Sequence, residues 1–212
     1  MSNKISVFTD GSCLNNGKKN SVGSIGIFFK DNDPDNLGQA IDNDGNKITN
    51  QTMELLAAIQ ALKIINDKIQ KQEINQNMIY LYTDSSYLIN SMTKWYKTWE
   101  ANNWKNSKGK DVENIDLIKL LYELKSKYIT IFKHIRSHQD EPTDKNSDKY
   151  FIWYGNYMAD KLATDESRQY IIENQNKGDE SEDPELEELI KEKLVITKKT
   201  KKSKKNNPEL NI

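Results

Sequence analysis

Short apolar runs, separated by polar turn-forming residues, open the chain. Residues 5–8 (ISVF) and 24–29 (SIGIFF) have the composition of strands, and the polar, glycine-containing segment between them is typical of a hairpin with a long loop. Residues 78–84 (MIYLYTD) are almost continuously apolar, as expected of a strand covered on both faces. Residues 128–135 (YITIFKHI) alternate like a strand, whereas residues 31–47 contain only a weak strand signal.

Helical periodicity begins after the first strands. Residues 52–69 are rich in helix formers and carry apolar side chains at positions 53, 56, 59 and 62. Further helices are predicted over about residues 85–104, 114–126 and 156–172. Strands first, and then an alternation of strands and helices, predict an α/β fold with a mixed sheet and helices on its faces.

The composition changes beyond about residue 173. Residues 173–192 are mostly acidic, and residues 193–205 carry seven lysines and no acid. A chain of 212 residues with 35% hydrophobic content suits one globular domain of ordinary size plus a tail. We therefore predict a domain at residues 1–172 and a disordered, charged C-terminal tail at residues 173–212.

The net charge and the cysteine content say more about the cellular location of the protein than about its binding partner. The formal net charge is −1, which gives no hint of a polyanionic ligand, and a single cysteine, Cys13, rules out an internal disulfide. There is no signal-peptide pattern and no apolar run long enough to span a bilayer. We expect an intracellular protein, cytoplasmic or nuclear, with no membrane partner. The lysine-rich tail suits a nuclear signal, a further nucleic-acid contact or a solvated end equally well.

Four acids stand where strand and helix ends are expected to converge. Asp10 and Asp84 each end an apolar strand after a threonine, and the C-terminal ends of such strands face the crevice where chemistry is usually sited. Adjacent strands would bring these two carboxylates close together, where they repel unless a cation lies between them. Glu54 lies in the first turn of a helix with small neighbouring residues, and Asp160 lies among apolar helix positions.

Each acid alone has a simpler explanation. Asp10 followed by Gly11 and Ser12 is turn chemistry, Glu54 complements a helix dipole, and Asp160 is a solvent-exposed helical acid. The four together favour a metal site, because Mg²⁺ prefers oxygen ligands from a few carboxylates. Two such ions about 4 Å apart are a recurring device for phosphodiester hydrolysis.

The motifs TDGSC, TNQTMELLAAI, YTDSSYLINSM, RSH and ADKLA, in this order, resemble a type 1 ribonuclease H of the cellular kind over about residues 4–170. The resemblance implies the ribonuclease H fold, a five-stranded mixed sheet flanked by helices. It implies a metal-dependent endonuclease that cuts the RNA strand of RNA/DNA hybrids with two Mg²⁺ ions, or Mn²⁺ in their place, leaving 3′-hydroxyl and 5′-phosphate ends. The implied metal-binding acids are Asp10, Glu54, Asp84 and Asp160.

The same resemblance assigns further residues. The family's mobile histidine, which assists proton transfer or product release, falls on His138, and its near-neutral pKa suits that role. His134 is interpreted as a packed strand residue. Contacts to the 2′-hydroxyls of the RNA strand fall on Cys13, Asn15, Asn50 and Gln51, with Asn16 and Gln51 also near the DNA strand. Asn50 also suits a helix cap.

Residues 94–110 form the second strong signal, with five lysines against one acid, Glu100, and tryptophans at 95, 99 and 104. The spacing places the tryptophans near one helix face, and we expect Trp99 and Trp104 to pin the segment to the core. The segment resembles the family's basic protrusion, in which Trp95 and Ser107 would border the DNA channel. A DNA phosphate pocket would fall on Thr49 and Asn114, with Lys47 where related enzymes carry an arginine.

Two features depart from the family pattern. Between His138 and Asp160 the chain is about a dozen residues longer than the family's usual loop, so we expect a long acidic and then aromatic loop at residues 139–156. The first strand begins almost at the N-terminus, so we expect no separate N-terminal hybrid-binding domain.

Two alternatives to a monomeric ribonuclease H remain open. One is a nuclease of the same fold with another substrate, such as an integrase, a resolvase or a reverse-transcriptase-associated domain. The other is a catalytically silent module that binds hybrids. The protrusion and the TNQ segment oppose the first alternative, and the presence of all four acids opposes the second.

Overall fold

The structure, a computed structural model, describes residues 4–16, 21–41, 48–75, 78–137 and 139–175. The chain divides into two compact units, Met1–Ser167 and Arg168–Ile212, and the fold described below is that of the first unit. The predicted tail beyond residue 175 lies outside the described residues, so the predicted domain boundary stays a prediction. No helix in the described part of the chain is both long and apolar enough to cross a membrane.

A five-stranded mixed sheet forms the centre of the first unit, as predicted. Its strands are β1 (Lys4–Leu14), β2 (Val22–Phe28), β3 (Leu37–Ile41), β4 (Met78–Thr83) and β5 (Ile129–His134), in the spatial order β3-β2-β1-β4-β5. The pairs β1–β2 and β2–β3 are antiparallel, and the pairs β1–β4 and β4–β5 are parallel. The weak strand signal at residues 31–47 therefore corresponds to the edge strand β3.

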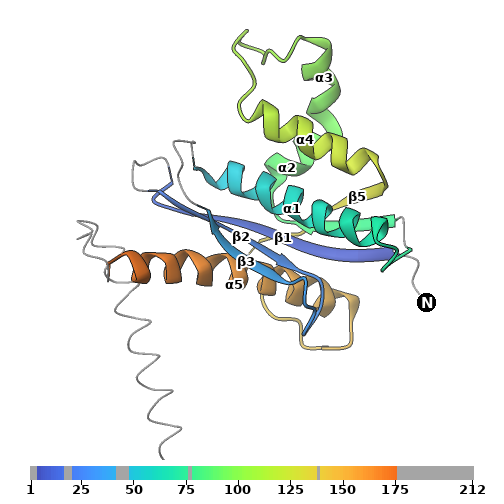
Figure 1. Cartoon of the computed structure of the whole chain (residues 1–212), viewed down its shortest axis with the longest axis vertical. Coiled ribbons are helices and arrows are strands. Elements are labelled where there is room, and N and C mark those ends of the chain that lie inside the picture. Colours follow the sequence, from blue (N-terminus) through green and yellow to red (C-terminus); the bar gives the residue numbers. More distant parts are fainter. Residues whose placement is uncertain (1–3, 17–20, 42–47, 76–77, 138, 176–212) are drawn as a thin grey trace, which may run out of the picture. The chain divides into compact units, whose positions relative to one another are not determined.

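Helices cover both faces of this sheet (Figure 1). They are α1 (Asn50–Gln70), α2 (Ser86–Asn90), the π-helical turn η1 (Ser91–Trp95), α3 (Tyr96–Ala101), α4 (Ile115–Ser126) and α5 (Asp148–Gln175). Figure 1 shows α1, α2 and α4 on one side of the strands and the N-terminal part of α5 on the other, with α3 projecting beyond the sheet. The chain therefore places two separate apolar layers against the two faces of one sheet.

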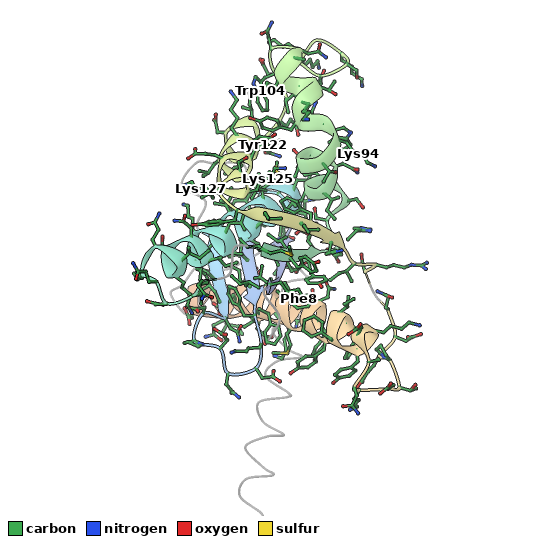
Figure 2. All side chains as sticks on the ribbon, turned by 90° about the vertical axis from the view of Figure 1, so that its right-hand side faces the viewer. Phe8, Lys94, Trp104, Tyr122, Lys125 and Lys127 are labelled. Atoms are coloured by element: carbon green, nitrogen blue, oxygen red, sulfur yellow. The ribbon has the colours of Figure 1, made fainter. Side chains whose placement is uncertain are left out.

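Neighbouring residues of β1 supply these two layers. Val7 faces the layer that includes Leu55 of α1 and Leu81 of β4, and all three side chains are fully buried. Phe8 faces the opposite layer with Ala159 of α5, and Figure 2 shows Phe8 between the sheet and that helix. Strand β4, predicted from its almost continuously apolar sequence to be covered on both faces, likewise places Ile79 and Leu81 in the first layer and Tyr82 in the second.

β1 does not end at Asp10, so turn chemistry is the wrong explanation of Asp-Gly-Ser. Asp10 pairs with Gly26, and the ladder continues as far as Leu14. Gly11 lies where α1 crosses the strand: a Cβ atom at this position would lie 2.2 Å from the backbone nitrogen of Glu54 and 2.4 Å from the carbonyl carbon of Met53. The glycine is needed because two backbones approach each other closely.

The helical stretch predicted over about residues 85–104 is confirmed from Ser86 to Ala101 and ends earlier than predicted. A π-helical turn separates α2 from α3, and α3 ends at Ala101. Trp104 follows in a left-handed conformation with φ of 60°, so it does not share a helix face with Trp95 and Trp99. Trp99 and Trp104 nevertheless pack against the core, as predicted.

α5 begins at Asp148, eight residues earlier than predicted, which corrects the expected 139–156 loop. Ser147 caps the helix: its hydroxyl accepts a hydrogen bond from the backbone N–H of Tyr150 at 3.2 Å. Phe151 lies edge-on to Phe8 with ring centroids 5.3 Å apart. The aromatic half of the expected loop is therefore helical, because its rings pack on the sheet, and only residues up to 147 connect β5 to the helix.

Candidate active site

Three of the four predicted acids meet at one end of the sheet. Asp10 of β1, Glu54 of α1 and Asp84, which follows β4, each offer a carboxylate oxygen, and these oxygens lie within 4.8 Å of one another. The register explains why Asp10 and Asp84 are close: Phe8 of β1 pairs with Tyr82 of the parallel strand β4, and each acid lies two residues further along the chain, Asp84 just past the end of β4. Side chains two residues apart share a face of a strand, so the two carboxylates converge.

Glu54 reaches the same point because α1 begins close above β1. The helix is capped by Thr49, whose hydroxyl accepts from the backbone N–H of Thr52 at 3.1 Å, while the Thr52 hydroxyl accepts from the Thr49 N–H at 2.8 Å. Asn50 is the first residue of the helix, so its interpretation as the cap is wrong. Glu54 is buried, and Thr83 donates a hydrogen bond to its Oε2 at 3.5 Å.

The proximity of these acids changes their proton affinity. Burial, together with the charges of Asp84 and Asp160, raises the pKa of Asp10 to about 7, against a smaller opposing effect of the Gly11 backbone N–H. Burial and the charges of Asp10 and Asp84 also raise the pKa of Glu54 well above its usual value. The arrangement is therefore electrostatically unfavourable by itself and becomes favourable when a cation is bound.

The donor set fits a hard divalent cation. All three groups offer carboxylate oxygens, the ligands that Mg²⁺ and Mn²⁺ take in proteins, and no nitrogen or sulfur ligand joins them among the described residues. A bound cation would also offset the repulsion that raises these pKa values.

Asp160 lies beside this cluster but outside the group of oxygens within 4.8 Å. It is exposed on α5, its Oδ1 accepts from the Thr164 hydroxyl at 3.5 Å, and its charge contributes to the raised pKa of Asp10. Asp160 and Asp84 both line a pocket of about 220 Å³, whose other walls include Arg136, Gln139, Trp153 and Tyr157. The fourth acid therefore faces the same space from the opposite layer of the fold.

The predicted RNA contacts gather at the start of α1. The side-chain oxygen of Asn16 accepts from the backbone N–H of Asn50 at 3.4 Å, which joins the end of β1 to the helix. Asn15 is in a left-handed conformation with φ of 55°, and its buried amide nitrogen has no acceptor among the described residues. Asn50 and Gln51 are exposed in the first turn of the helix.

Cys13 differs from these polar neighbours. Its side chain is buried in an apolar cluster with Ile25, Ile48 and Met53, and burial raises the pKa of its thiol. Any contact of Cys13 with a ligand would therefore involve its backbone.

The predicted phosphate pocket is seen only in part. The Thr49 hydroxyl is engaged in capping α1. Asn114 precedes α4 in a left-handed conformation with φ of 58°, and its amide donates to the Tyr87 hydroxyl at 3.2 Å. Lys47 and His138 lie outside the described residues.

The protrusion, residues 94–110, extends away from the sheet (Figure 1). Trp95 is 38% exposed, and its ring lies 5.5 Å from that of Trp99. Ser107 is exposed in a turn held by the Asn106 side chain, which accepts from the backbone N–H groups of Lys108 and Lys110. In Figure 2, Lys94 and Trp104 are seen on this part of the chain.

Several residues near the acids were not identified from the sequence. His134 is exposed rather than packed, and its Nε2 lies 3.2 Å from the Ser86 hydroxyl and 3.3 Å from the backbone oxygen of Asp84. Arg136, Trp153 and Tyr157 line the pocket. The spacing of the aromatic residues at 150, 153, 154 and 157 is that of one helix face and was the available signal.

Comparisons with known proteins bear on the family of the chain. A family model for RNase H matches residues 2–168. The chain is 34% identical over 149 residues to the ribonuclease H of Chlorobium phaeobacteroides (strain BS1), a match that covers 70% of this chain and 92% of the relative. It is 35% identical over 173 residues to the ribonuclease HI of Rickettsia conorii (strain ATCC VR-613 / Malish 7), covering 82% and 96% of the two chains.

Solved structures share the fold. The solution structure of the PFV RNase H domain superposes with a TM-score of 0.54 at 26% identity, over 77% of this chain and 93% of that domain. The crystal structure of LC9-RNase H1 superposes with a TM-score of 0.55 at 22% identity, over 77% and 72% of the two chains, which supports the fold alone.

Proposed function

The chain belongs to the ribonuclease H family, a family of metal-dependent nucleases, and from this premise we propose that it is an endonuclease for the RNA strand of RNA/DNA hybrids. The products are a 3′-hydroxyl and a 5′-phosphate end. The observation that carries the proposal is the convergence of Asp10, Glu54 and Asp84 at the end of the sheet, with Asp160 across the adjoining pocket.

The acids are the proposed ligands of two Mg²⁺ ions, with Mn²⁺ as a substitute. Such a pair of ions supplies an activated water and neutralises the leaving oxygen of a phosphodiester. Asp10 is central to the arrangement: the charges of Asp84 and Asp160 help to raise its pKa, and its own charge helps to raise the pKa of Glu54. Thr83 keeps the Glu54 carboxylate oriented by its hydrogen bond. His138 is proposed to assist proton transfer or product release.

The substrate contacts are proposed from their place around the acids. Asn16, Asn50 and Gln51 lie together at the start of α1, where short polar groups are suited to reading a 2′-hydroxyl. Asn15, with an unpaired amide nitrogen among the described residues, and the backbone of Cys13 belong to the same group. Trp95, Ser107 and the lysines of the protrusion would contact the DNA strand, with Thr49, Asn114 and Lys47 at one of its phosphates.

The location and assembly of the protein are proposed from the sequence alone. We propose a monomer inside the cell, in the cytoplasm or the nucleus, with the lysine-rich tail as an additional contact to nucleic acid or as a nuclear signal. The lysines of the tail support each of these two roles equally.

The test is a cleavage assay on an end-labelled RNA/DNA hybrid with and without Mg²⁺. Asp10→Asn and Asp84→Asn should each reduce cleavage at least about a hundredfold. Each removes a proposed metal ligand, and loss of a residue that merely hydrogen-bonds to a ligand already costs up to about a hundredfold. The matched control is Asp165→Asn, which alters a half-buried acid of α5 that pairs with Lys161, and this variant should retain activity.

Three outcomes would contradict the proposal. Binding without cleavage would indicate a silent hybrid-binding module. Cleavage of a DNA duplex, an RNA duplex and single-stranded RNA to the same extent as the hybrid would indicate a nuclease with another substrate. Equal activity of Asp10→Asn and Asp165→Asn would exclude the acid cluster as the site.

A further inference from the structure

A cavity of about 510 Å³ lies between α4, the segment formed by η1 and α3, and the edge strand β5. Its walls include Met92 and Lys97 of that segment, Tyr122 and Lys125 of α4, and Phe132 of β5. Figure 2 shows Tyr122 and Lys125 on α4, next to β5. The cavity shares no lining residue with the pocket beside the acids, so the proposed function gives it no role.

Lys125 is a half-buried cation on the face of α4 that otherwise carries core residues. It follows Ile118 and Leu121 at helical spacing, and both of these side chains are fully buried. Its Nζ donates to the backbone oxygen of Met92 at 3.4 Å and lies 4.6 Å from the centre of the Tyr122 ring. Both contacts involve neutral groups, so the charge of Lys125 has no counter-ion among the described residues.

A second lysine adds to the positive charge of this cavity. Lys97 also lines it, and burial together with the charge of Lys97 lowers the pKa of Lys125. No carboxylate is among the described residues that line the cavity, and Glu123, two residues before Lys125, pairs with Lys127 instead. Two ammonium groups that repel each other are stabilised when an anion binds to both.

The other walls of the cavity are apolar and aromatic. Met92 is buried, and Ile131 and Phe132 are half-buried residues of β5. The rings of Tyr96 and Tyr122 are stacked, with their centroids 3.5 Å apart and 8° between their planes. Apolar walls with a few converging charged groups are typical of a site for a small organic molecule, and such sites commonly have volumes of about 300–1,000 Å³.

We propose that this cavity is a binding site for a small organic phosphate: the phosphate group pairs with Lys97 and Lys125, and the organic part lies against Met92 and Phe132. Lysine is a common ligand of phosphate, and a phosphate monoester carries up to about two negative charges, which two ammonium groups balance. A free nucleoside monophosphate and the 5′-phosphate end of an RNA strand share this chemistry. The inference goes beyond the proposed function and does not depend on cleavage, because the cavity is separate from the acids.

Isothermal titration calorimetry of the full chain with adenosine 5′-monophosphate (AMP) tests the site. EDTA is present, so that no cation joins the nucleotide to the acids. Lys125→Met and Lys97→Met should each weaken binding at least about tenfold, as expected for the loss of one charge-assisted hydrogen bond. Lys127→Met is the matched control: it removes one positive charge from an exposed residue that does not line the cavity, and it should leave the Kd for AMP unchanged.

Three further ligands identify the group that is recognised. Adenosine, which lacks the phosphate, should not bind. Inorganic phosphate should bind more weakly than AMP, because it has no organic part to lie against the apolar walls. An RNA trinucleotide with a 5′-phosphate distinguishes the two sources: affinity equal to that of AMP would include strand ends among the ligands, and no binding would restrict the site to free nucleotides.

Stability and location are measured on the same proteins. Lys125→Met should keep or raise Tm, because methionine replaces a cation that is partly withdrawn from water. In ¹H–¹⁵N NMR spectra of the parent protein, AMP should shift the backbone amide signals of Thr130 and Phe132, which line the cavity, and not those of Asp10 and Glu54.

Four outcomes would overturn the proposal. Absence of saturable AMP binding to the parent protein would exclude the site, and equal affinity for adenosine would show that no phosphate is recognised. Equal weakening by Lys125→Met and Lys127→Met would indicate a general attraction by surface charge. A lower Tm of Lys125→Met with an unchanged Kd would assign this lysine to packing alone. Amide shifts confined to the surroundings of Asp10 and Glu54 would place the nucleotide at the acids.

Discussion

Like charges gather in two regions of this protein, and their surroundings differ. At the acidic edge, formed by Asp10, Glu54 and Asp84, three carboxylates from separate elements lie within 4.8 Å. On the protrusion, five lysines at positions 94, 97, 105, 108 and 110 are all exposed to solvent. Burial and mutual repulsion of the ionised carboxylates destabilise the folded state, whereas the repulsion between separated surface lysines is screened by water and salt.

The two regions are also built differently. The acidic edge depends on the approach of α1 to β1 at Gly11 and on the register of β1 with β4. The protrusion is closed by local contacts, such as the backbone hydrogen bond from Val112 to Trp104 at 3.0 Å and the ion pair between Lys105 and Asp111 at 2.5 Å. The acidic edge therefore depends on packing between elements far apart in the sequence, whereas the exposed lysines of the protrusion depend only on contacts within a short segment.

The largest effect on stability should come from adding one methyl group at the acidic edge. Gly11→Ala should destabilise the protein by at least about 3 kcal/mol, because its Cβ would meet the backbone of Glu54, which cannot move aside as a side chain can. At Gly109, on the protrusion, an added Cβ would have no atom within 4 Å, and only the φ of +72° would be strained. Gly109→Ala should therefore lower the free energy of unfolding by about 1 kcal/mol. Denaturant unfolding of both variants measures the difference. Equal losses of stability would show that the close approach at Gly11 is not rigid.

The next effect is a dependence of stability on pH in the metal-free protein. The pKa of Asp10 is about 7 in the folded chain and about 4 when unfolded, so the folded state holds the extra proton between these values. Stability should therefore fall as pH rises through this window and level off above about pH 7, with a loss of about 2 kcal/mol between about pH 5 and about pH 8.

Chemical denaturation with EDTA, and again with Mg²⁺, tests this expectation. Mg²⁺ should raise stability most above about pH 7, where Asp10 is ionised. Asp10→Asn should lose less stability over the same pH range and gain less from Mg²⁺. Parallel pH profiles for this variant and the parent would contradict the electrostatic account of the acidic edge.

The smallest effect should follow substitution on the protrusion. Lys94→Ala and Lys108→Ala should each weaken hybrid binding about two- to fivefold, with kcat unchanged, and lower the slope of log K against log salt by about 1 for each phosphate that the variant no longer neutralises. Lys71→Ala is the control, since Lys71 is exposed at the opposite end of α1 from the acids. A salt slope that stays the same in the protrusion variants would place the DNA strand elsewhere.

Local pattern was sufficient for much of the fold. Short apolar runs predict the strand that leads to Asp10 and the strand before Asp84, and helical periodicity predicts the helix that contains Glu54. The structure confirms these three elements. The residues at which the elements begin and end were harder to predict from the sequence. β1 continues past Gly11 because it stays paired with β2 as far as Leu14, and α5 begins at Asp148 because rings such as Phe151 pack on the sheet.

Other features have no local signal. The π-helical turn at Ser91–Trp95 lies within a segment with good helical propensity, so nothing in its composition marks the interruption. His134 is predicted to be packed because it lies on an alternating strand, yet β5 is an edge strand and His134, its last residue, is exposed.

The sequence by itself identified the candidate residues for the chemistry: four acids, a lysine-rich segment with tryptophans, and motifs in the order typical of one family. Only the tertiary structure decided that carboxylate oxygens of Asp10, Glu54 and Asp84 lie within 4.8 Å of one another, and that Asp160 lines a pocket together with Asp84. It also decided that Trp153 and Tyr157 stack in the lining of that pocket. The reason is physical: residue type and periodicity are local properties, whereas distance, burial and the resulting pKa shifts depend on how elements far apart in sequence pack together.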